Sequence, residues 1–190
     1  MSQTVLVTGA AGDIGSTICP ALRAAGHTVI GLDLETPDEV DRALIADITD
    51  GEAMQSAADE ADTIIHLAAR RNDGDFLDEL VPPNVVGLYQ VMRAARQSER
   101  THRLVLASTI QTIFGLIGVR DVIGPGDEAA TNHYALTKLW AERMGEMYHR
   151  CYGLSVIAAR IGWFCADPSA KARAVRRKPM MADIYLSPSD

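Results

Sequence analysis

Two side chains with the spacing of an acid–base pair stand in the second half of the chain, Tyr134 and Lys138. Residues four apart on an α-helix lie on the same face, one turn from each other. An ammonium group beside a phenol stabilises the phenolate and lowers the tyrosine pKa from about 10 toward neutrality. A tyrosine with such a pKa can exchange protons with a substrate, so the pair predicts acid–base chemistry.

The same spacing also arises by chance on the surfaces of many helices, and the pair alone is ambiguous. Its context favours catalysis, because an apolar run over residues 104–107 predicts a strand that ends in two hydroxyl residues, Ser108 and Thr109. A nucleotide-binding pattern precedes both. The chemistry is therefore expected where these elements meet.

The nucleotide-binding pattern is a glycine-rich loop, T-G-A-A-G-D-I-G, at residues 8–15. An apolar run over residues 5–7 predicts a buried strand before it, and apolar positions at helical spacing follow it as far as Gly26. A Cβ in such a loop would block the tight turn or the approach of a phosphate, and the N–H groups at the helix start face the anion. The loop predicts a pyrophosphate site that includes Gly9, Gly12, Asp13, Ile14 and Gly15.

An acidic residue, Asp33, follows the next predicted strand, residues 28–32, and stands 24 positions after Gly9. A carboxylate there can accept hydrogen bonds from an adenosine ribose, although an exposed loop acid would look the same in the sequence. It would also repel a ribose 2′-phosphate, and no Arg or Lys lies between Gly31 and Pro37. NAD is therefore expected in preference to NADP.

Strand and helix patterns alternate along the chain, with further strands expected over residues 43–48, 62–68 and 156–161 and helices over 52–58, 84–99 and 132–152. This alternation predicts an α/β protein with a doubly wound parallel sheet of about six strands, a Rossmann fold. We expect one domain over residues 1–190, with an irregular substrate-side segment over 163–190.

The composition is that of a globular protein, with 47% hydrophobic and 23% charged residues among 190. No segment has the roughly 18 uncharged apolar residues of a membrane span, and the N-terminus lacks the features of a signal peptide. A cytoplasmic location is expected. The net charge of −7 disfavours binding to nucleic acid or to anionic lipid.

The cysteines Cys19, Cys151 and Cys165 are odd in number and widely spaced, which predicts reduced thiols and no metal site. One local charge cluster remains, the basic stretch over residues 171–178, which contains Lys171, Arg173, Arg176, Arg177 and Lys178. It is either a solvated surface segment or an anchor for an anionic substrate.

Together these motifs resemble the extended short-chain dehydrogenase/reductase family, also called the NAD-dependent epimerase/dehydratase family. The segments that carry the resemblance stand in the family's order: the glycine loop, Asp33, Ala46-Asp47-Ile48, His66-Leu67-Ala68-Ala69, Asn84-Val85-Val86-Gly87, Ser108-Thr109, Tyr134-Ala135-Leu136-Thr137-Lys138 and Arg160-Ile161-Gly162. The resemblance runs through most of the chain.

By this resemblance, Asp47 and Ile48 flank the adenine, and Leu67, Ala68 and Ala69 line the nicotinamide side. Thr109 completes a catalytic triad with Tyr134 and Lys138, with Ser108 as the alternative hydroxyl, and Lys138 also binds the nicotinamide ribose. Asn84 supports that lysine. Simpler interpretations stay open: Asp47 as a helix cap, His66 as a locally satisfied buried side chain and Asn84 as a helix-surface amide.

Within the family the chain is most similar to uronate dehydrogenases and related sugar 1-dehydrogenases, through N-V-V-G-L-Y-Q-V-M-R-A-A-R, R-L-V-L-A-S-T and A-R-I-G. The resemblance implies that Tyr134 removes a proton from the anomeric hydroxyl while hydride passes to NAD. Ile110 and Gln111 replace an Asn-His pair of those enzymes, and Trp163 replaces a serine. A neutral aldose or polyol is therefore as open as a uronate, and the candidate substrate contacts are Arg70, Ser108, Gln111 and Trp163, with Arg71 or the basic stretch as further receptors for a carboxylate.

Two alternatives are a nucleotide-sugar epimerase that retains NAD and a non-catalytic NAD-binding regulatory protein. A sugar dehydratase is less favoured, because Ile110 and Gln111 stand where those enzymes have an Asp-Glu pair. The resemblance also predicts a further strand and helical segment past Asp190, so the C-terminal part is expected to be short. A homodimer is expected through the helices over residues 84–99 and 132–152.

Overall fold

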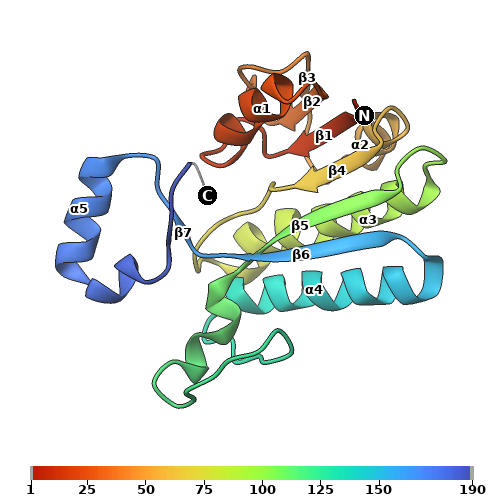
Figure 1. Cartoon of the computed structure of the whole chain (residues 1–190). Helices are drawn as coiled ribbons and strands as arrows, with labels where there is room; N and C mark the ends of the chain where they lie inside the picture. The colour runs from red at the N-terminus through yellow and green to blue at the C-terminus, as the bar shows by residue number, and fades with distance from the viewer. Residues whose placement is uncertain (1, 189–190) are drawn as a thin grey trace.

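A computed structural model of the chain describes residues 2–188. Its main sheet has six parallel strands in the order β3-β2-β1-β4-β5-β6 (Figure 1). In chain order these strands are β1 Thr4–Thr8, β2 Thr28–Asp33, β3 Arg42–Ile45, β4 Thr63–His66, β5 Arg103–Thr109 and β6 Ser155–Ile161. This is the doubly wound parallel sheet that the alternating strand and helix patterns predict.

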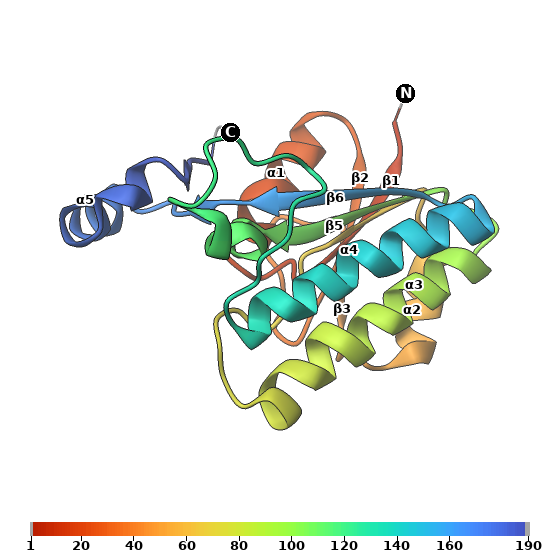
Figure 2. The ribbon, with the colours of Figure 1, turned by 90° about the horizontal axis from the view of Figure 1, so that it is seen from below.

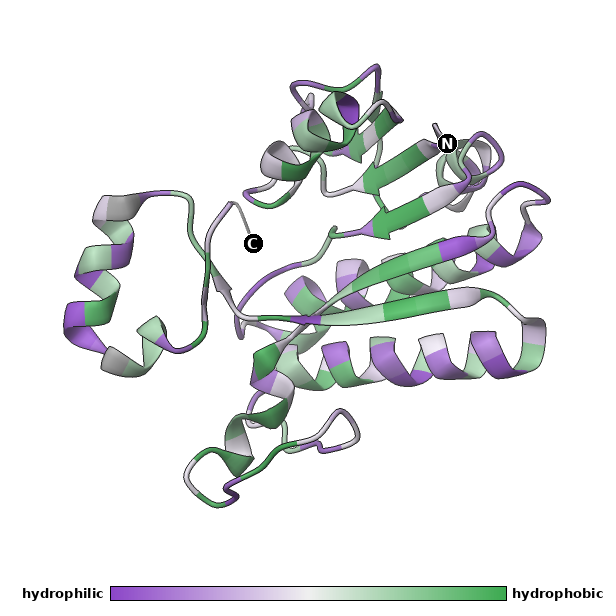
Figure 3. Cartoon of the chain, viewed as in Figure 1, coloured by the Kyte–Doolittle hydropathy of each residue, from purple (hydrophilic) through white to green (hydrophobic). Residues whose placement is uncertain are grey.

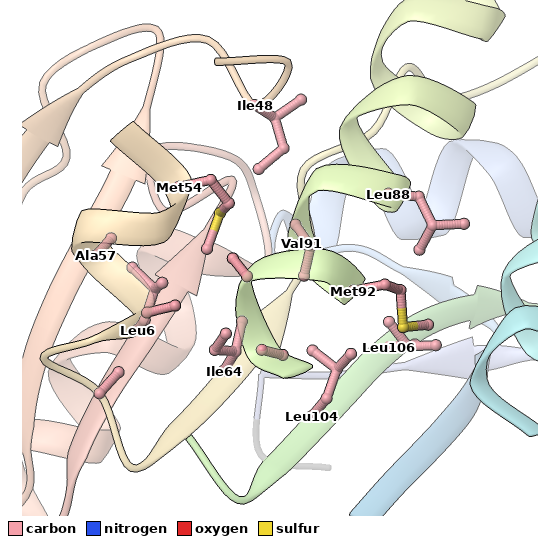
Figure 4. Packing of buried hydrophobic residues seen from close by; sticks show 14 of the residues in the cluster. Leu6, Ile48, Met54, Ala57, Ile64, Leu88, Val91, Met92, Leu104 and Leu106 are labelled. Atoms are coloured by element: carbon pink, nitrogen blue, oxygen red, sulfur yellow. The ribbon is translucent and has the colours of Figure 1, made fainter. Parts of the chain in front are cut away.

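Helices cover both faces of the sheet. One face is covered by α1, Gly15–Ala24, and the other by α2 (Gly51–Ala58), α3 (Leu88–Gln97) and α4 (His133–Tyr152) (Figure 2). The larger hydrophobic core lies beneath α2, α3 and α4 and includes Leu6, Met54, Ile64, Met92 and Leu104 (Figure 4).

The central strands are apolar along most of their length because both of their faces are covered (Figure 3). In β1, Leu6 packs into the larger core, whereas its neighbours Val5 and Val7 belong to a second core with Cys19 of α1. Successive side chains of a strand point to opposite faces, so one short run of three apolar residues serves both layers.

The strand order reverses between β1 and β4. From β1 the chain moves outward to β2 and β3, and it then returns to pair β4 with the other side of β1, Val5 opposite Thr63 and Thr8 opposite His66. Such a reversal leaves a crevice at the carboxyl ends of the strands, where open α/β sheets bind their ligands.

Two elements differ from the sequence pattern near this crevice. The helix expected over residues 84–99 becomes regular only at Leu88, because two wide π-helical segments precede it, η1 (Phe76–Leu80) and η2 (Pro82–Gly87). Two prolines begin η2, and their missing N–H groups prevent ordinary helical hydrogen bonds. The strand expected over residues 43–48 ends at Ile45.

The segment expected to be irregular contains regular structure. Trp163–Phe164 (β7) pairs with Tyr185–Leu186 (β8), and between them lie α5 (Pro168–Arg177) and the short helix η4 (Pro179–Ala182). Figure 1 shows α5 standing apart from the sheet. Its residues are mostly small or basic, and Val175 is its one branched apolar residue, so the sequence offers no apolar run by which to recognise a buried helix. Residues 189 and 190 of the expected segment lie outside the described residues.

None of the helices within residues 2–188 combines the length and the apolar character needed to cross a bilayer. Over the same described range, no three His, Cys, Asp or Glu side chains come together in a way that could hold a metal ion. Cys19, Cys151 and Cys165 have free thiols.

Candidate active site

A cleft of about 1670 Å³ lies at the carboxyl ends of the strands. It runs from the glycine loop past the ends of β2, β4, β5 and β6 to β7. The predicted site residues that line it are Gly9, Gly12, Asp13, Ile14, Gly15, Asp33, Asp47, Ile48, Leu67, Ala68, Ala69, Arg70, Ser108, Thr109, Gln111, Tyr134, Lys138 and Trp163. Asn84 lies behind the wall.

The glycine loop is shaped for close approach of its backbone. Gly9 has a positive φ of 74°, and a Cβ on it would lie only 2.6 Å from the backbone nitrogen of Ala68. A Cβ on Gly15 would collide with the carbonyl oxygen of Gly9. The loop leads directly into the N-terminus of α1, where the positive end of the helix dipole favours an anion. These features fit a dinucleotide pyrophosphate.

Asp33 is fixed at the end of β2, beside this loop. Its Oδ2 accepts a hydrogen bond from the backbone N–H of Ala11 (2.9 Å), and its Oδ1 accepts one from the N–H of Leu34 (2.7 Å). A carboxylate has about four acceptor positions, so capacity remains for two hydroxyl groups of a ribose.

The next cleft residues, Asp47 and Ile48, follow β3. Oδ1 of Asp47 accepts hydrogen bonds from the backbone N–H and the hydroxyl of Thr49 (2.8 and 2.7 Å). The cap of helix α2 is Asp50, so Asp47 is not the helix cap that the sequence left open. Ile48 is buried against Gly87, where a Cβ would collide with its side chain.

Residues 67–73, which we call the strap, cross the cleft wall after β4. The strap begins with hydrogen bonds from Leu67 N to the carbonyl oxygen of Thr8 (3.0 Å) and from Ala68 N to its hydroxyl (3.4 Å). The same hydroxyl contacts Nδ1 of His66 at 2.8 Å. Burial, with a smaller effect of the Lys138 charge, lowers the pKa of His66 to about 3. His66 is therefore a neutral, locally satisfied side chain.

Asn84 holds the strap from behind. Its Oδ1 accepts a hydrogen bond from Arg70 N (2.8 Å), and its Nδ2 donates to Arg70 O (3.0 Å) and to the hydroxyl of Thr137 (3.1 Å). The side chain is 4% exposed, so the helix-surface interpretation of Asn84 is wrong. The amide instead joins the strap to α4, one residue from Lys138.

Thr109, Tyr134 and Lys138 come together where β5 ends and α4 begins. Asn132 caps α4 by accepting a hydrogen bond from Ala135 N at 2.8 Å, which fixes the first turn of the helix. The hydroxyl of Thr109 is hydrogen-bonded to Tyr134, and Nζ of Lys138 lies 5.8 Å from the centre of the Tyr134 ring. All three residues are buried.

The charge acting on Tyr134 differs from the expectation. Burial raises the pKa of Tyr134, while the positive charge of Arg71 and the hydrogen bond with Thr109 oppose that rise. Burial also lowers the pKa of Lys138 to about 8, because desolvation disfavours its charged form. The lowered tyrosine pKa expected from Lys138 is therefore not found, and the guanidinium of Arg71 is the cation that favours the phenolate.

Ser108 has a different partner from Thr109. Its hydroxyl donates a hydrogen bond to Glu142, which also forms a two-point ion pair with Arg160. Sequence reasoning missed Glu142, although its position four residues after Lys138 places it on the same face of α4. Ser108, Glu142 and Arg160 form a hydrogen-bonded polar group that adjoins Thr109 through Ser108.

The other candidate substrate contacts also have partners. Oε1 of Gln111 accepts from Asn132 Nδ2 at 2.8 Å, and the ring of Trp163 packs edge-on against Tyr185 with 5.8 Å between centroids. Arg70 pairs with Glu79 at 2.8 Å. Within the basic stretch, Lys178 lines the cleft.

The strand order, the glycine loop and the acid after β2 define a dinucleotide-binding protein of the doubly wound class. The chain belongs to the NAD dependent epimerase/dehydratase family, whose family pattern matches residues 5–177. This membership confirms the resemblance seen in the sequence.

Several individual relatives are sugar dehydrogenases, and an epimerase is also among the relatives. The chain is 28% identical to L-arabinose 1-dehydrogenase (NAD(P)(+)) of Haloferax volcanii, over 98% of this chain and 78% of that protein. It is 26% identical to uronate dehydrogenase of Pseudomonas putida, over 83% of this chain and 60% of that protein. The crystal structure of glucuronic acid dehydrogenase from Chromohalobacter salexigens superposes with a TM-score of 0.82 and 28% identity, over 98% of this chain and 67% of that one.

Proposed function

We propose that this protein is an NAD-dependent dehydrogenase that oxidises the anomeric carbon of a sugar or sugar acid. The observation that carries the proposal is the buried group of Thr109, Tyr134 and Lys138 in the same cleft as the glycine loop and Asp33. Oxidation of an alcohol needs a hydride acceptor for its carbon and a base for its hydroxyl proton. A dinucleotide site next to an acid–base tyrosine can provide both.

The described residues fit NAD. The glycine loop and the start of α1 would hold its pyrophosphate, and Asp33 would bind the adenosine ribose. Asp47 and Ile48 would flank the adenine. Residues 67–69 of the strap would line the nicotinamide side. Bound there, NAD supplies the hydride acceptor for the oxidation. The loop fits this role because it makes a tight turn that only glycine permits: a Cβ on Gly9 or Gly15 would collide with neighbouring backbone atoms.

In this proposal the protein's own residues move the proton. Tyr134, as phenolate, takes the proton of the anomeric hydroxyl, and Thr109 donates a hydrogen bond that holds the reacting oxygen. Lys138, whose Nζ lies 5.8 Å from the centre of the Tyr134 ring, binds the nicotinamide ribose, and the positive charge of Arg71 favours the phenolate. Loss of hydride from carbon and loss of the proton from oxygen leave the lactone carbonyl.

The proposal draws support from the relatives, whose names describe oxidation of arabinose and of uronates. The chain spans 60% of the uronate dehydrogenase and 78% of the arabinose dehydrogenase, so the activity and substrate of the whole protein are part of the proposal. An epimerase would use the same cofactor site and the same tyrosine but return the hydride to the sugar.

The test is to mix the protein with NAD and a panel of free aldoses, uronates and nucleotide sugars while following NADH absorbance. We expect net NADH from a free sugar, and a loss of at least about 100-fold in kcat for Tyr134→Phe. Tyr152→Phe is the matched control, since Tyr152 is an exposed tyrosine of the same helix. A sugar isomer formed without net NADH would favour the epimerase, and NAD binding without turnover of any substrate would overturn the enzyme proposal.

The preference for NAD over NADP is tested at Asp33. Its carboxylate would lie beside the ribose and repel a 2′-phosphate. Asp33→Asn keeps an acceptor for Ala11 N while removing the charge, so the ratio of Kd for NADP to Kd for NAD should fall by at least about tenfold. An unchanged ratio would show that Asp33 does not set the preference.

We propose that two copies pair through α3 and α4. The outer surfaces of the two helices expose large apolar side chains, Tyr89, Leu136 and Trp140 among them, as expected for a helix interface. Sedimentation of the wild type and of Trp140→Glu tests this: a dimer that becomes a monomer supports it, and a wild-type monomer contradicts it.

A further inference from the structure

We propose that Arg71 is the receptor for an anionic group of the substrate, so that the preferred sugar carries a carboxylate or a phosphate. The inference rests on the proposed dehydrogenase function and names the substrate class for the same site. It starts from the different surroundings of two adjacent arginines, Arg70 and Arg71, in the strap.

The backbone of the strap is anchored on both sides of Arg71. Asn84 binds both the N–H and the carbonyl of Arg70, and the Oδ1 of Asp73 accepts a hydrogen bond from the N–H of His133 at 3.1 Å. Asn72 between them adopts a positive φ of 65°, a conformation that asparagine tolerates better than most residues. The place from which the Arg71 side chain extends is therefore fixed.

The two guanidinium groups differ in what they face. Arg70 forms a pair with Glu79 of η1, with Nε–Oε2 at 2.9 Å and Nη2–Oε2 at 2.8 Å. Arg71 reaches across the cleft to the glycine loop, where its Nη1 lies 2.6 Å from Oδ2 of Asp13. It is also the charged side chain whose field acts on the Tyr134 phenol. Arg71 therefore stands between the cofactor cradle and the acid–base tyrosine.

The pair with Asp13 is easily exchanged. Its two side chains are 68% and 62% exposed, and exposed ion pairs contribute little to stability because water screens them. Arginine has five N–H donors in a planar fork that matches the two oxygens of a carboxylate or a phosphate. A substrate anion can take over this fork at little cost to the protein, whereas a neutral sugar would leave the guanidinium with Asp13.

The experiment compares glucose, glucuronate and glucose 6-phosphate as probes, with NAD saturating, for wild type, Arg71→Gln and Arg71→Lys. The control is Arg42→Gln, because Arg42 is an exposed arginine of β3 that pairs with Glu60 and does not line the cleft. Wild type should have a kcat/KM at least about tenfold higher for one of the anionic sugars than for glucose. Arg71→Gln should lower that ratio by about 10- to 100-fold, as expected for loss of a charged hydrogen bond. Arg71→Lys should restore part of the ratio, and Arg42→Gln should leave it unchanged.

The ratio separates recognition of the anion from the effect of Arg71 on Tyr134, because that effect acts equally on charged and neutral sugars. If Arg71→Gln lowers kcat/KM equally for all three sugars, or if wild type prefers glucose, the proposal is wrong. The proposal would also be wrong if Arg71→Gln left the kcat/KM ratio unchanged and raised the Kd for NAD more than about tenfold. Arg71 would then bind the cofactor pyrophosphate and not a substrate anion.

Binding gives a second measurement that does not need turnover. Calorimetric titration of the three sugars into NAD-loaded Tyr134→Phe, with and without Arg71→Gln, should show anion binding that depends on Arg71. Such binding without NADH formation by the wild type would overturn the proposed dehydrogenase but leave the charge recognition standing. Equal affinity for charged and neutral sugars would overturn the charge recognition alone.

Discussion

Glu142 and Arg160 form a two-point ion pair across the α4–β6 junction, with Nε–Oε1 at 3.0 Å and Nη2–Oε2 at 2.8 Å. The two side chains are only 11% and 19% exposed. Each member of the pair has a further hydrogen-bond partner: Ser108 donates to Glu142, and Nη1 of Arg160 donates to Asp127 O at 2.9 Å. The pair thereby fixes the end of β5 just where Thr109 enters the site.

Removing one partner of this pair should be costly, because the other charge would stay largely shielded from water without a counter-charge. We expect Glu142→Gln to lower the free energy of unfolding by about 3 kcal/mol. Glu146→Gln is the control, since Glu146 pairs with Arg143 on the surface at 57% exposure, and its loss should cost under about 1 kcal/mol. Urea denaturation measures both. Equal small losses would show that the Glu142–Arg160 pair does not hold the β5 end.

The role of the glycine loop, residues 8–15, can be tested by comparing two glycines that have the same backbone conformation but different surroundings. Gly9 and Gly26 have φ of 74° and 86°, yet a Cβ on Gly26 meets no atom within 4 Å. Gly26→Ala should therefore cost only the left-handed strain, about 1 kcal/mol, with NAD affinity unchanged. Gly9→Ala also collides with the strap backbone at Ala68 and should raise the Kd for NAD at least about tenfold. Calorimetric titration with NAD measures the Kd of both variants. Equal Kd values for Gly9→Ala and Gly26→Ala would contradict this account of the loop.

The sequence predicted the parts of this site that local spacing encodes. Three glycines between a strand and a helix indicate the cradle, and residues four apart on α4 place Tyr134 and Lys138 on one face. The fold follows in the same way from alternating apolar runs. The structured segment after Ile161 was missed, because α5 is built from small and basic residues and has too few large apolar side chains to form a recognisable apolar run.

The contacts that set the electrostatics of the site could not be predicted this way. Asp13 and Arg71 are 58 positions apart, and only the β1–β4 crossover brings them within 2.6 Å. The sequence likewise shows Lys138 beside Tyr134 but not the burial that changes the pKa of both. Desolvation depends on every element packed around a group, and the identity of its neighbours along a helix does not reveal it.

Asn84 should control the order of the strap. Asn84→Ala removes the acceptor of Arg70 N and the donor to Arg70 O, and we expect a loss of about 2 kcal/mol in the free energy of unfolding. Hydrogen exchange at the Arg70 amide should become at least about tenfold faster, because its acceptor is gone. Val86→Ala, an exposed neighbour in η2, is the control and should change neither value. Unchanged exchange at Arg70 in Asn84→Ala would rule out the clamp.

His66 should make the protein sensitive to acid. Its pKa is about 3 in the folded protein, against 6.5 for the ordinary side chain. Between these values the unfolded chain binds a proton that the folded protein excludes, so the free energy of unfolding should fall as the pH falls from 6.5 toward 3. One such group contributes about 1.4 kcal/mol per pH unit, or about 2 kcal/mol between pH 6.5 and pH 5.

The variant that isolates this effect is His66→Asn, whose amide can reach the Thr8 hydroxyl as Nδ1 does but does not titrate. Urea unfolding of both proteins from pH 7 to pH 4 gives the difference in their free energies of unfolding, from which the contribution of the carboxylates cancels. As the pH falls from 6.5 to 5, we expect the wild type to lose about 2 kcal/mol of unfolding free energy relative to His66→Asn. Parallel pH profiles would mean that His66 takes up a proton as readily in the folded protein as in the unfolded chain, and its assignment as a neutral partner of Thr8 would be wrong.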